Sequence, residues 1–225
     1  MPNVKRQLAT PPAVLTFPVG PLETNCYILA DESTSAALCI DPGADAAMLK
    51  DVVQSHGWSP CGIALTHGHG DHIGAVAALR KAWNVPLYVH ALDAPMLPSA
   101  QRNLSVLLGK NVTAPDADHH LDDLHQLQCG TLCVQVLHTP GHTPGSVCFY
   151  VAEPASGPPL LFSGDTLFRE EVGRCDLPGG DWDALQSSIR SRLYVLPPHT
   201  IVYPGHGPAT TIRHELIHNP YVRAA

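Results

Sequence analysis

The chain has 225 residues, of which 44% are hydrophobic and 15% are charged, a composition typical of a globular protein with one sizeable core. Its net charge is −7 and its 13 lysines and arginines are scattered, which argues against a nucleic-acid-binding surface. The longest apolar runs are strand-sized and the first twenty residues lack the apolar core of a secretory signal, so we expect a cytoplasmic protein with no membrane partner.

Short β-rich runs open the chain, and helices and strands then alternate. The predicted elements are strands at 14–20, 24–30 and 37–40, a helix at 44–56, a strand at 62–66, a helix at 73–83, strands at 87–90, 132–137, 147–151 and 160–163, a helix at 182–193 and a strand at 200–203. Residues 91–130 give weaker signals, helical around 104–108 and a polar, solvated loop at 116–125; residues 154–159 resemble a hairpin tip. This order predicts one α/β domain over residues 1–225, with helices packed outside stacked sheets.

The seven cysteines contain no CxxC pair. Five of them lie in apolar, strand-like segments, where cysteine behaves as a small hydrophobic residue: Cys26, Cys39, Cys61, Cys133 and Cys148. We therefore predict buried, reduced thiols rather than a disulfide framework or a zinc ribbon.

The turn after the strand at 62–66 reads THGHGDHIG. Its glycines follow the pattern GxGxxxG, not the GxGxxG of a dinucleotide-binding turn, which argues against a phosphate site. Around these glycines, His67, His69, Asp71 and His72 place four ligand-type side chains in one turn. Because these are the side chains that bind divalent metals, the turn predicts a metal site.

Three more ligand-type residues follow other apolar strands, each beside glycine. They are His142 in HTPGHTPG, Asp165 in SGDTLF and His206 in YPGHGP. The full set of five imidazoles and two carboxylates exceeds the four positions of one tetrahedral zinc. It suits two adjacent metals that share a bridging carboxylate.

These motifs resemble those of the metallo-β-lactamase superfamily, and GPLETNCYIL, IDPG, GDTLFREEVGR and TTIRHELIHNPYV resemble its short, glyoxalase II-like branch of hydroxyacylglutathione hydrolase-like proteins. The resemblance implies a four-layer αββα sandwich with the site on one edge. It also implies roles for individual residues: His67, His69 and His142 on the first metal, Asp71, His72 and His206 on the second, Asp165 as the bridge, Asp71 and Asp165 as the catalytic carboxylates, and Asp41 as a support behind the ligands.

Two divalent cations would lower the pKa of a water molecule to about 7 and polarise a carbonyl group. We expect zinc, with iron or manganese as alternatives, since all three accept His and Asp ligands. The predicted activity is hydrolysis of a small-molecule thioester, such as a 2-hydroxyacyl thiol like lactoylglutathione, by a metal-bridging hydroxide. No serine or cysteine nucleophile is required.

The sequence departs from full-length glyoxalase II enzymes in two respects. Those enzymes carry an additional C-terminal helical region that grips glutathione, whereas this sequence is expected to stop after a single tail helix. Arg174 matches the basic residue that follows the GDTLF loop and is the predicted substrate-binding residue, but Asp176 and Pro208 replace the two tyrosines that assist it. Glutathione recognition is therefore left open, as is the oligomeric state.

Other function classes remain open. A mononuclear-iron persulfide dioxygenase of the same fold would use two histidines and one carboxylate, which this set contains as His67, His142 and Asp165. A lactone or ester hydrolase would use the same hydroxide. A non-catalytic metal-binding module would be expected to lack some of the ligands, and all seven are present. The metal content separates the dioxygenase from the hydrolases.

Overall fold

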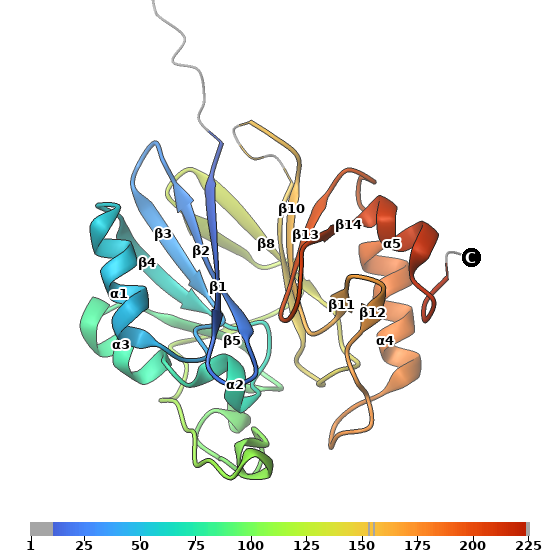
Figure 1. The fold of residues 1–225 in the computed structure, drawn as a ribbon, viewed down its shortest axis with the longest axis horizontal. Helices are drawn as coiled ribbons and strands as arrows, with labels where there is room; N and C mark the ends of the chain where they lie inside the picture. The colour runs from blue at the N-terminus through green and yellow to red at the C-terminus, as the bar shows by residue number, and fades with distance from the viewer. Residues whose placement is uncertain (1–10, 153, 155, 224–225) are drawn as a thin grey trace, which may run out of the picture.

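The computed structural model describes residues 11–152, 154 and 156–223. Two six-stranded sheets face each other at the centre of the molecule, and helices cover the outer face of each sheet (Figure 1). This is the four-layer αββα arrangement that the sequence predicted. No helix among the described residues has the length and apolarity that a membrane crossing needs.

The first half of the chain forms the first sheet and its helices. The strand order is β1 (Ala13–Val19), β2 (Thr24–Asp31), β3 (Ala36–Ile40), β4 (Ser59–Ala64), β5 (Leu87–His90) and β6 (His119–Leu121), antiparallel from β1 to β3 and parallel from β3 to β6. The helices are α1 (Ala46–Ser55), α2 (Gly70–Ile73) and α3 (Val76–Trp83), with 3₁₀ turns η1 (Ala94–Met96) and η2 (Ser105–Leu108).

The second half forms the second sheet and its helices. The strand order is β14 (Thr210–Thr211), β13 (Ile201–Pro204), β10 (Leu160–Gly164), β9 (Val147–Val151), β8 (Leu132–His138) and β7 (Gln126–Cys129). Only β10 and β13 are parallel neighbours in this sheet. A small hairpin, β11 (Leu167–Phe168) with β12 (Glu171–Val172), follows β10, and the helices are α4 (Trp182–Ser188), its π-helical continuation η3 (Ile189–Leu193) and α5 (Ile212–His218).

Side chains that alternate along each strand build three apolar layers. On β2, Cys26 and Ile28 pack toward the helices α1 and α3, while Tyr27 and Leu29 point into the space between the two sheets. The third layer lies between the second sheet and α4, where Leu185 is fully buried. Because a strand's side chains alternate between faces, a strand buried on both faces reads in sequence as a continuous apolar run.

Asp31, at the end of β2, joins the two sheets. Its carboxylate accepts hydrogen bonds from the N–H and hydroxyl of Ser33 at 2.9 and 2.6 Å within its own loop. It also accepts from the N–H and hydroxyl of Thr131, at 2.6 and 2.8 Å, in the turn between β7 and β8. One carboxylate therefore fixes the relative position of the two sheets at this end of the sandwich.

Several local predictions were wrong. Within the predicted loop at 116–125, residues 119–121 form β6, which pairs with β5 and stacks His119 on Tyr88 at 5.1 Å between ring centroids. The predicted helix at 73–83 is interrupted after Ile73, because the N–H of Ala75 donates to the carbonyl of Pro42 at 2.9 Å instead of continuing the helix.

The prediction of buried thiols also fails in part. All seven cysteines are free, as expected, but Cys133 is exposed and Cys61 is only half-buried.

Two predictions fall partly outside the described residues. The predicted hairpin tip includes residue 155, and the N-terminus, for which no secretory signal was expected, includes residues 1–10.

Candidate metal centre

The seven predicted ligand residues converge at one edge of the sandwich, where β4, β8, β10 and β13 end. In the parallel pairs the carboxyl ends of the strands point to the same edge, so the loops that follow them meet there. Asp41 follows β3 at the same edge.

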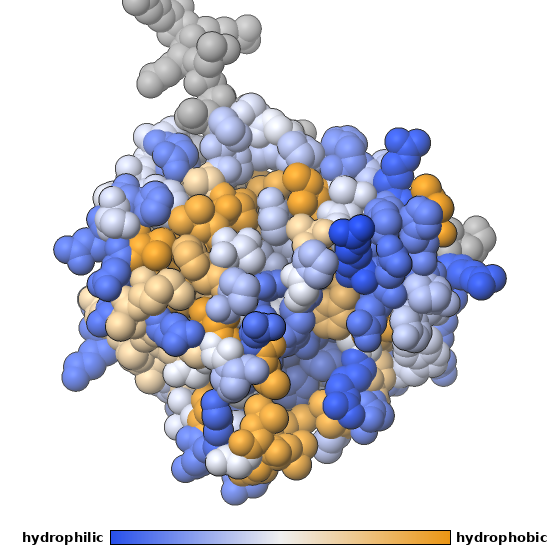
Figure 2. Space-filling view, viewed as in Figure 1, coloured by the Kyte–Doolittle hydropathy of each residue, from blue (hydrophilic) through white to orange (hydrophobic). Residues whose placement is uncertain are grey.

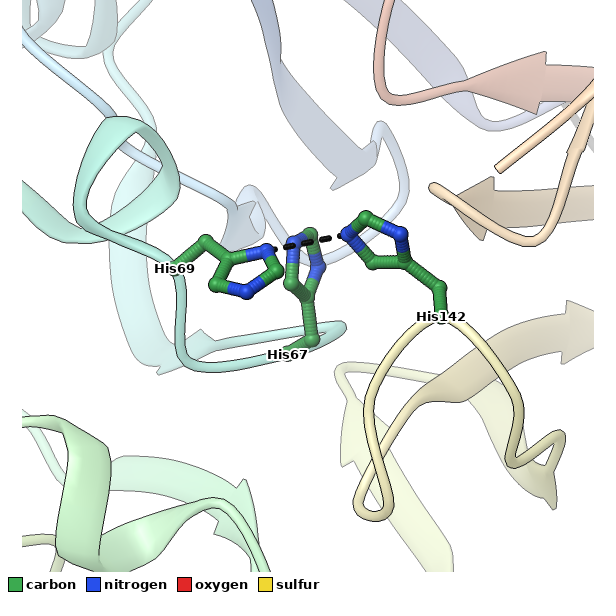
Figure 3. A group of neighbouring side chains, drawn as sticks. All are labelled: His67, His69 and His142. Carbon is green, nitrogen blue, oxygen red and sulfur yellow. Dashed lines mark hydrogen bonds between the residues drawn. The ribbon is translucent and has the colours of Figure 1, made fainter. Parts of the chain in front are cut away.

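His67, His69 and His142 form the first group (Figure 3). Each offers a nitrogen within 4.8 Å of the others, and Nδ1 of His69 lies 2.9 Å from Nε2 of His142. The opposite nitrogen of His142 donates to the carbonyl of Arg174 at 2.8 Å, while Nδ1 of His67 lies 3.1 Å from the hydroxyl of Thr66. These outer contacts orient the rings of His67 and His142, so that Nε2 of each points into the cluster.

Asp71, His72 and His206 form the second group. Oδ2 of Asp71 lies 3.5 Å from Nε2 of His72 and 3.3 Å from Nε2 of His206. The far nitrogen of His206 donates to the carbonyl of Leu22 at 3.1 Å, and the hydroxyl of Thr24 donates to Asp71 at 2.9 Å. Asp71 and His206 are therefore each held in place by a residue outside the group.

Asp165 lies between the two groups. Its Oδ1 is 3.4 Å from Nε2 of His72, and its Oδ2 is 3.6 Å from Nε2 of His142 and 3.7 Å from Nε2 of His206. The close approach depends on Gly205, because a Cβ there would collide with Asp165 Oδ1. Asp165 is thus placed to reach both groups at once.

Asp41 lies behind His72, on the side of the ring that faces away from Asp71 and Asp165. Its oxygens accept from the N–H and hydroxyl of Thr66, at 2.7 and 2.5 Å, and contact Nδ1 of His72 at 3.0 Å. With both oxygens engaged, the carboxylate orients His72 rather than offering a free ligand atom. Asp41 adopts a φ of 51°, in the left-handed region, which L-residues enter at a cost of about 1–2 kcal/mol.

Burial sets the charge of the first group. It lowers the pKa of His67 well below its usual range and lowers the pKa of His69 to about 3, because a charged imidazole would lose hydration and repel its histidine neighbours. Both rings are therefore neutral at pH 7. Neutral imidazole is the form that binds a metal.

Carboxylates set the charge of the second group. Burial alone would lower the pKa of His72, but the surrounding Asp71, Asp165 and Asp41 raise it to about 10. For the carboxyl of Asp71, burial acts in the opposite direction and would raise the pKa. The neighbouring His72 and His206 nevertheless hold the pKa of Asp71 well below its usual range. Ionised carboxylates gathered around one point favour a positive charge there.

Unpartnered buried atoms show that the residues fit a cation. Nε2 of His67, Nε2 of His72 and Oδ1 of Asp165 are buried without a hydrogen-bond partner. Buried polar atoms nearly always have a partner, and lone pairs that converge on a common space are satisfied by a metal. With two donor groups that share Asp165, the cluster fits a dinuclear metal site.

The sequence did not single out Asp93, a fully buried residue that joins two of the ligand loops. It accepts from the N–H of Gly68, between His67 and His69, at 3.0 Å, and from the N–H of Gly145 at 2.8 Å. A lone aspartate 25 residues from one partner and 52 from the other carries no local signal of this role.

Residues 19–206 match the metallo-beta-lactamase superfamily, a span that runs from the end of β1 through β13 and includes all seven converging residues. The chain belongs to this superfamily.

Individual relatives agree with this assignment. The chain is similar to the probable metallo-hydrolase YqgX of Bacillus subtilis (strain 168), with 40% identity over 207 residues that cover 92% of this chain and 95% of the relative. It is 33% identical to the hydroxyacylglutathione hydrolase GloC of Haemophilus influenzae over 214 residues, which cover 92% and 97% of the two chains. These matches identify a metallo-hydrolase with a His/Asp metal site.

Two solved structures share the fold at 42% sequence identity. One is the BLEG-1 B3 metallo-beta-lactamase, with a TM-score of 0.87 over 93% of this chain and 99% of that chain. The other is TTHA1623 in a di-iron-bound form, with a TM-score of 0.82 over 93% and 100%. The second shows that a protein similar to this one holds two irons.

In this member of the metallo-β-lactamase superfamily, a cleft of about 520 Å³ opens beside the metal centre, and Arg174 lines it. The guanidinium of Arg174 is exposed and forms a bidentate pair with Asp176, with both N–O distances at 2.7 Å. Arg174 thus lines the cleft, but Asp176 compensates its charge, and the role of Arg174 in substrate binding stays a prediction.

Proposed function

We propose that the protein is a dinuclear metallohydrolase that cleaves thioesters, with a 2-hydroxyacyl thiol as substrate class. The observation that carries this proposal is the position of Asp165, whose two oxygens face the two histidine groups. The similarity to a hydroxyacylglutathione hydrolase supports the thioester as the scissile group. In the reaction, the acyl carbon gains a water oxygen, the C–S bond breaks, and the sulfur leaves as a thiolate that takes up a proton.

The residues of the cluster have two proposed roles, which are to hold the cations and to orient the side chains that hold them. His67, His69 and His142 would hold one cation, and Asp71, His72 and His206 the second, with Asp165 shared. When bound, the two divalent cations supply an activated water and polarise the scissile carbonyl. Asp41 and Thr66 fix the ring of His72 and the start of the ligand loop, so that the donors are oriented before substrate arrives.

A covalent mechanism with a cysteine nucleophile has less support than metal-dependent hydrolysis. Cys175 is the cysteine close to Arg174, but burial raises the pKa of its thiol, and its Sγ donates to the carbonyl of Gly173 at 3.6 Å. A nucleophilic cysteine needs the thiolate form. We therefore assign no chemical step to Cys175.

Metal counting together with a substrate screen tests the proposal. Protein saturated in turn with zinc, iron and manganese is expected to hold two metals per chain and to hydrolyse lactoyl thioesters. Asp165→Ala should lose one metal and abolish turnover while the far-ultraviolet circular dichroism is unchanged, because the core does not depend on this side chain.

The same preparation separates the alternatives. A single tightly bound iron per chain, with oxygen consumed in the presence of a persulfide, would replace the hydrolase by the mononuclear dioxygenase. The screen also includes a lactone and a β-lactam, because one similar protein is a B3 metallo-beta-lactamase. Hydrolysis of either of these without thioester hydrolysis would overturn the thioesterase assignment.

A further inference from the structure

The cleft beside the metal centre is apolar on the side formed by the first half of the chain. Leu22, Leu104, Leu107 and Leu108 line it there, and we refer to these four residues as the leucine wall. Three of them are exposed to solvent, Leu107 by 68%, Leu108 by 46% and Leu22 by 44%. Figure 2 shows hydrophobic side chains gathered at the lower edge of the molecule, over the segment that follows β5.

Buried polar residues hold the segment of the leucine wall in place. Asn103 and Ser105 are each 1% exposed, and the carbonyl of Asn103 accepts from the N–H of Gly70, in the ligand loop, at 2.8 Å. The side-chain amide of Asn103 donates to the carbonyl of Val112 at 2.9 Å, and its oxygen accepts from the N–H of Ser105 at 3.0 Å. The polar side chains thus face inward and anchor the segment, while the leucines face the cleft.

Backbone geometry at Leu104 also points to a function. Leu104 has a φ of 63°, in the left-handed region that a leucine enters at a cost of about 1–2 kcal/mol. Such conformations persist where the surrounding structure enforces them, and they gather at ligand-binding sites. An exposed apolar patch beside a polar centre is likewise a mark of a binding surface.

The leucine wall is continuous with the metal centre. Leu22 contributes its side chain to the wall, and its carbonyl accepts from Nδ1 of His206 at 3.1 Å. Leu22 and Leu108 also share a second, smaller hollow next to Asp71. A molecule whose reacting group lies between the two histidine groups would therefore extend along these leucines.

Size and charge indicate which part of the substrate lies there. A cleft of about 520 Å³ is of the class that holds a drug-sized ligand, so a small 2-hydroxyacyl group leaves most of it to the thiol part. On the opposite side, Asp176 already pairs with Arg174, and Arg169 and Glu171 add one charge of each sign, so the side chains there offer little net attraction for a strongly anionic thiol.

We propose that the leucine wall binds an apolar hydrocarbon portion, aliphatic or aromatic, of the leaving thiol. This inference rests on the proposed thioesterase function. It adds that the preferred thiol is apolar rather than a charged peptide thiol.

The test uses metal-loaded protein and one acyl group, lactoyl, on three thiols: benzyl mercaptan, N-acetylcysteamine and glutathione. We expect the wild type to have the highest kcat/KM on the benzyl thioester. The double variant Leu107→Ala/Leu108→Ala should lower that value roughly ten- to fiftyfold, because it removes apolar contact area, and should change the N-acetylcysteamine value by less than about twofold. The matched control is Val195→Ala/Ile217→Ala, two similarly exposed apolar residues that do not line the cleft.

Each result is decisive. Equal losses on the benzyl and N-acetylcysteamine thioesters, or preference for the glutathione thioester in both proteins, would overturn the inference and leave the thioesterase intact. A shift from dimer to monomer in the double variant, with unchanged kinetics, would show that the leucines cover a subunit interface instead. Absence of hydrolysis of all three thioesters would overturn the proposed function and this inference together.

Discussion

The hydroxyl of Thr143 donates a 2.7 Å hydrogen bond to Oδ2 of Asp93, and the same oxygen accepts from the N–H of Gly68. Thr143 follows His142, whereas Gly68 lies between His67 and His69, so one buried carboxylate links the two loops that carry the first histidine group. Burial raises the pKa of Asp93, an effect that the hydrogen bonds from Thr143 and the two glycines oppose. Asp93 is therefore a positioning residue for the metal centre.

Replacement of Asp93 should loosen the metal. We expect Asp93→Ala to lower metal affinity roughly ten- to a hundredfold, since outer residues that orient ligands have effects of that size. Competition with a chelator measures the affinity. The control is Asp118→Ala, which also removes an acceptor for a backbone N–H, that of Leu87, but far from the site. A lower melting temperature with unchanged affinity would reduce Asp93 to a structural role.

The sequence indicated which ligand-type side chains would converge because of how they are spaced, while their role as ligands stays a prediction. Four of the seven lie within six residues, so the turn from His67 to His72 carries its own signal. The other three follow apolar strands beside glycine, and strands that end at a common edge bring their loops together. Which side chains would meet could therefore be inferred without coordinates.

The features that were missed depend on contacts between distant segments. The strand β6 has only three residues, two of them exposed histidines, so it lacks an apolar run. The role of Asp93 depends on two loops that the fold brings to it. The leucines at 104–108 were predicted as part of a helical stretch, and an apolar residue that faces a cleft cannot be distinguished by sequence from one that faces the core.

Turnover should be insensitive to thiol-blocking reagents. Cys175 is the cysteine nearest in sequence to Arg174, and its thiol is held in the protonated form by burial. Iodoacetamide should therefore leave the rate unchanged within about twofold, with metal content measured in the same sample. Loss of turnover on alkylation, prevented by Cys175→Ser and without loss of metal, would favour a covalent mechanism.

Asp31 should make the free energy of unfolding depend on pH in the acid range. Burial would raise the pKa of this carboxyl, but hydrogen bonds from Ser33 and Thr131 hold it well below the usual value. A group whose pKa is lower in the folded state stabilises it above the unfolded pKa, about 3.9, and that stabilisation is lost as the pH falls toward the folded pKa.

The difference in unfolding free energy between wild type and Asp31→Asn isolates this effect. At pH 7 we expect the variant to be less stable by about 2–3 kcal/mol, because several charge-assisted hydrogen bonds are weakened. Urea unfolding at pH 7, 4 and 3 should show this difference shrinking at the lower values. Asp51→Asn, on the exposed surface of α1, is the control, and a difference that stays constant with pH would contradict the assignment.

The pair between Arg174 and Asp176 should tune the response to substrate charge. If Arg174 binds a substrate carboxylate, Arg174→Ala should lower kcat/KM for an anionic thioester roughly ten- to a hundredfold and affect a neutral one much less.

Because Asp176 competes for the same guanidinium, Asp176→Asn should raise kcat/KM for the anionic thioester. Because an exposed ion pair in water is weak, the gain on the anionic thioester should not exceed about fivefold. Measuring both thioesters on wild type, both single variants and the double variant completes the cycle. The gain from Asp176→Asn should vanish when residue 174 is alanine. Equal effects on anionic and neutral thioesters would show that the pair shapes the loop and does not contact the substrate.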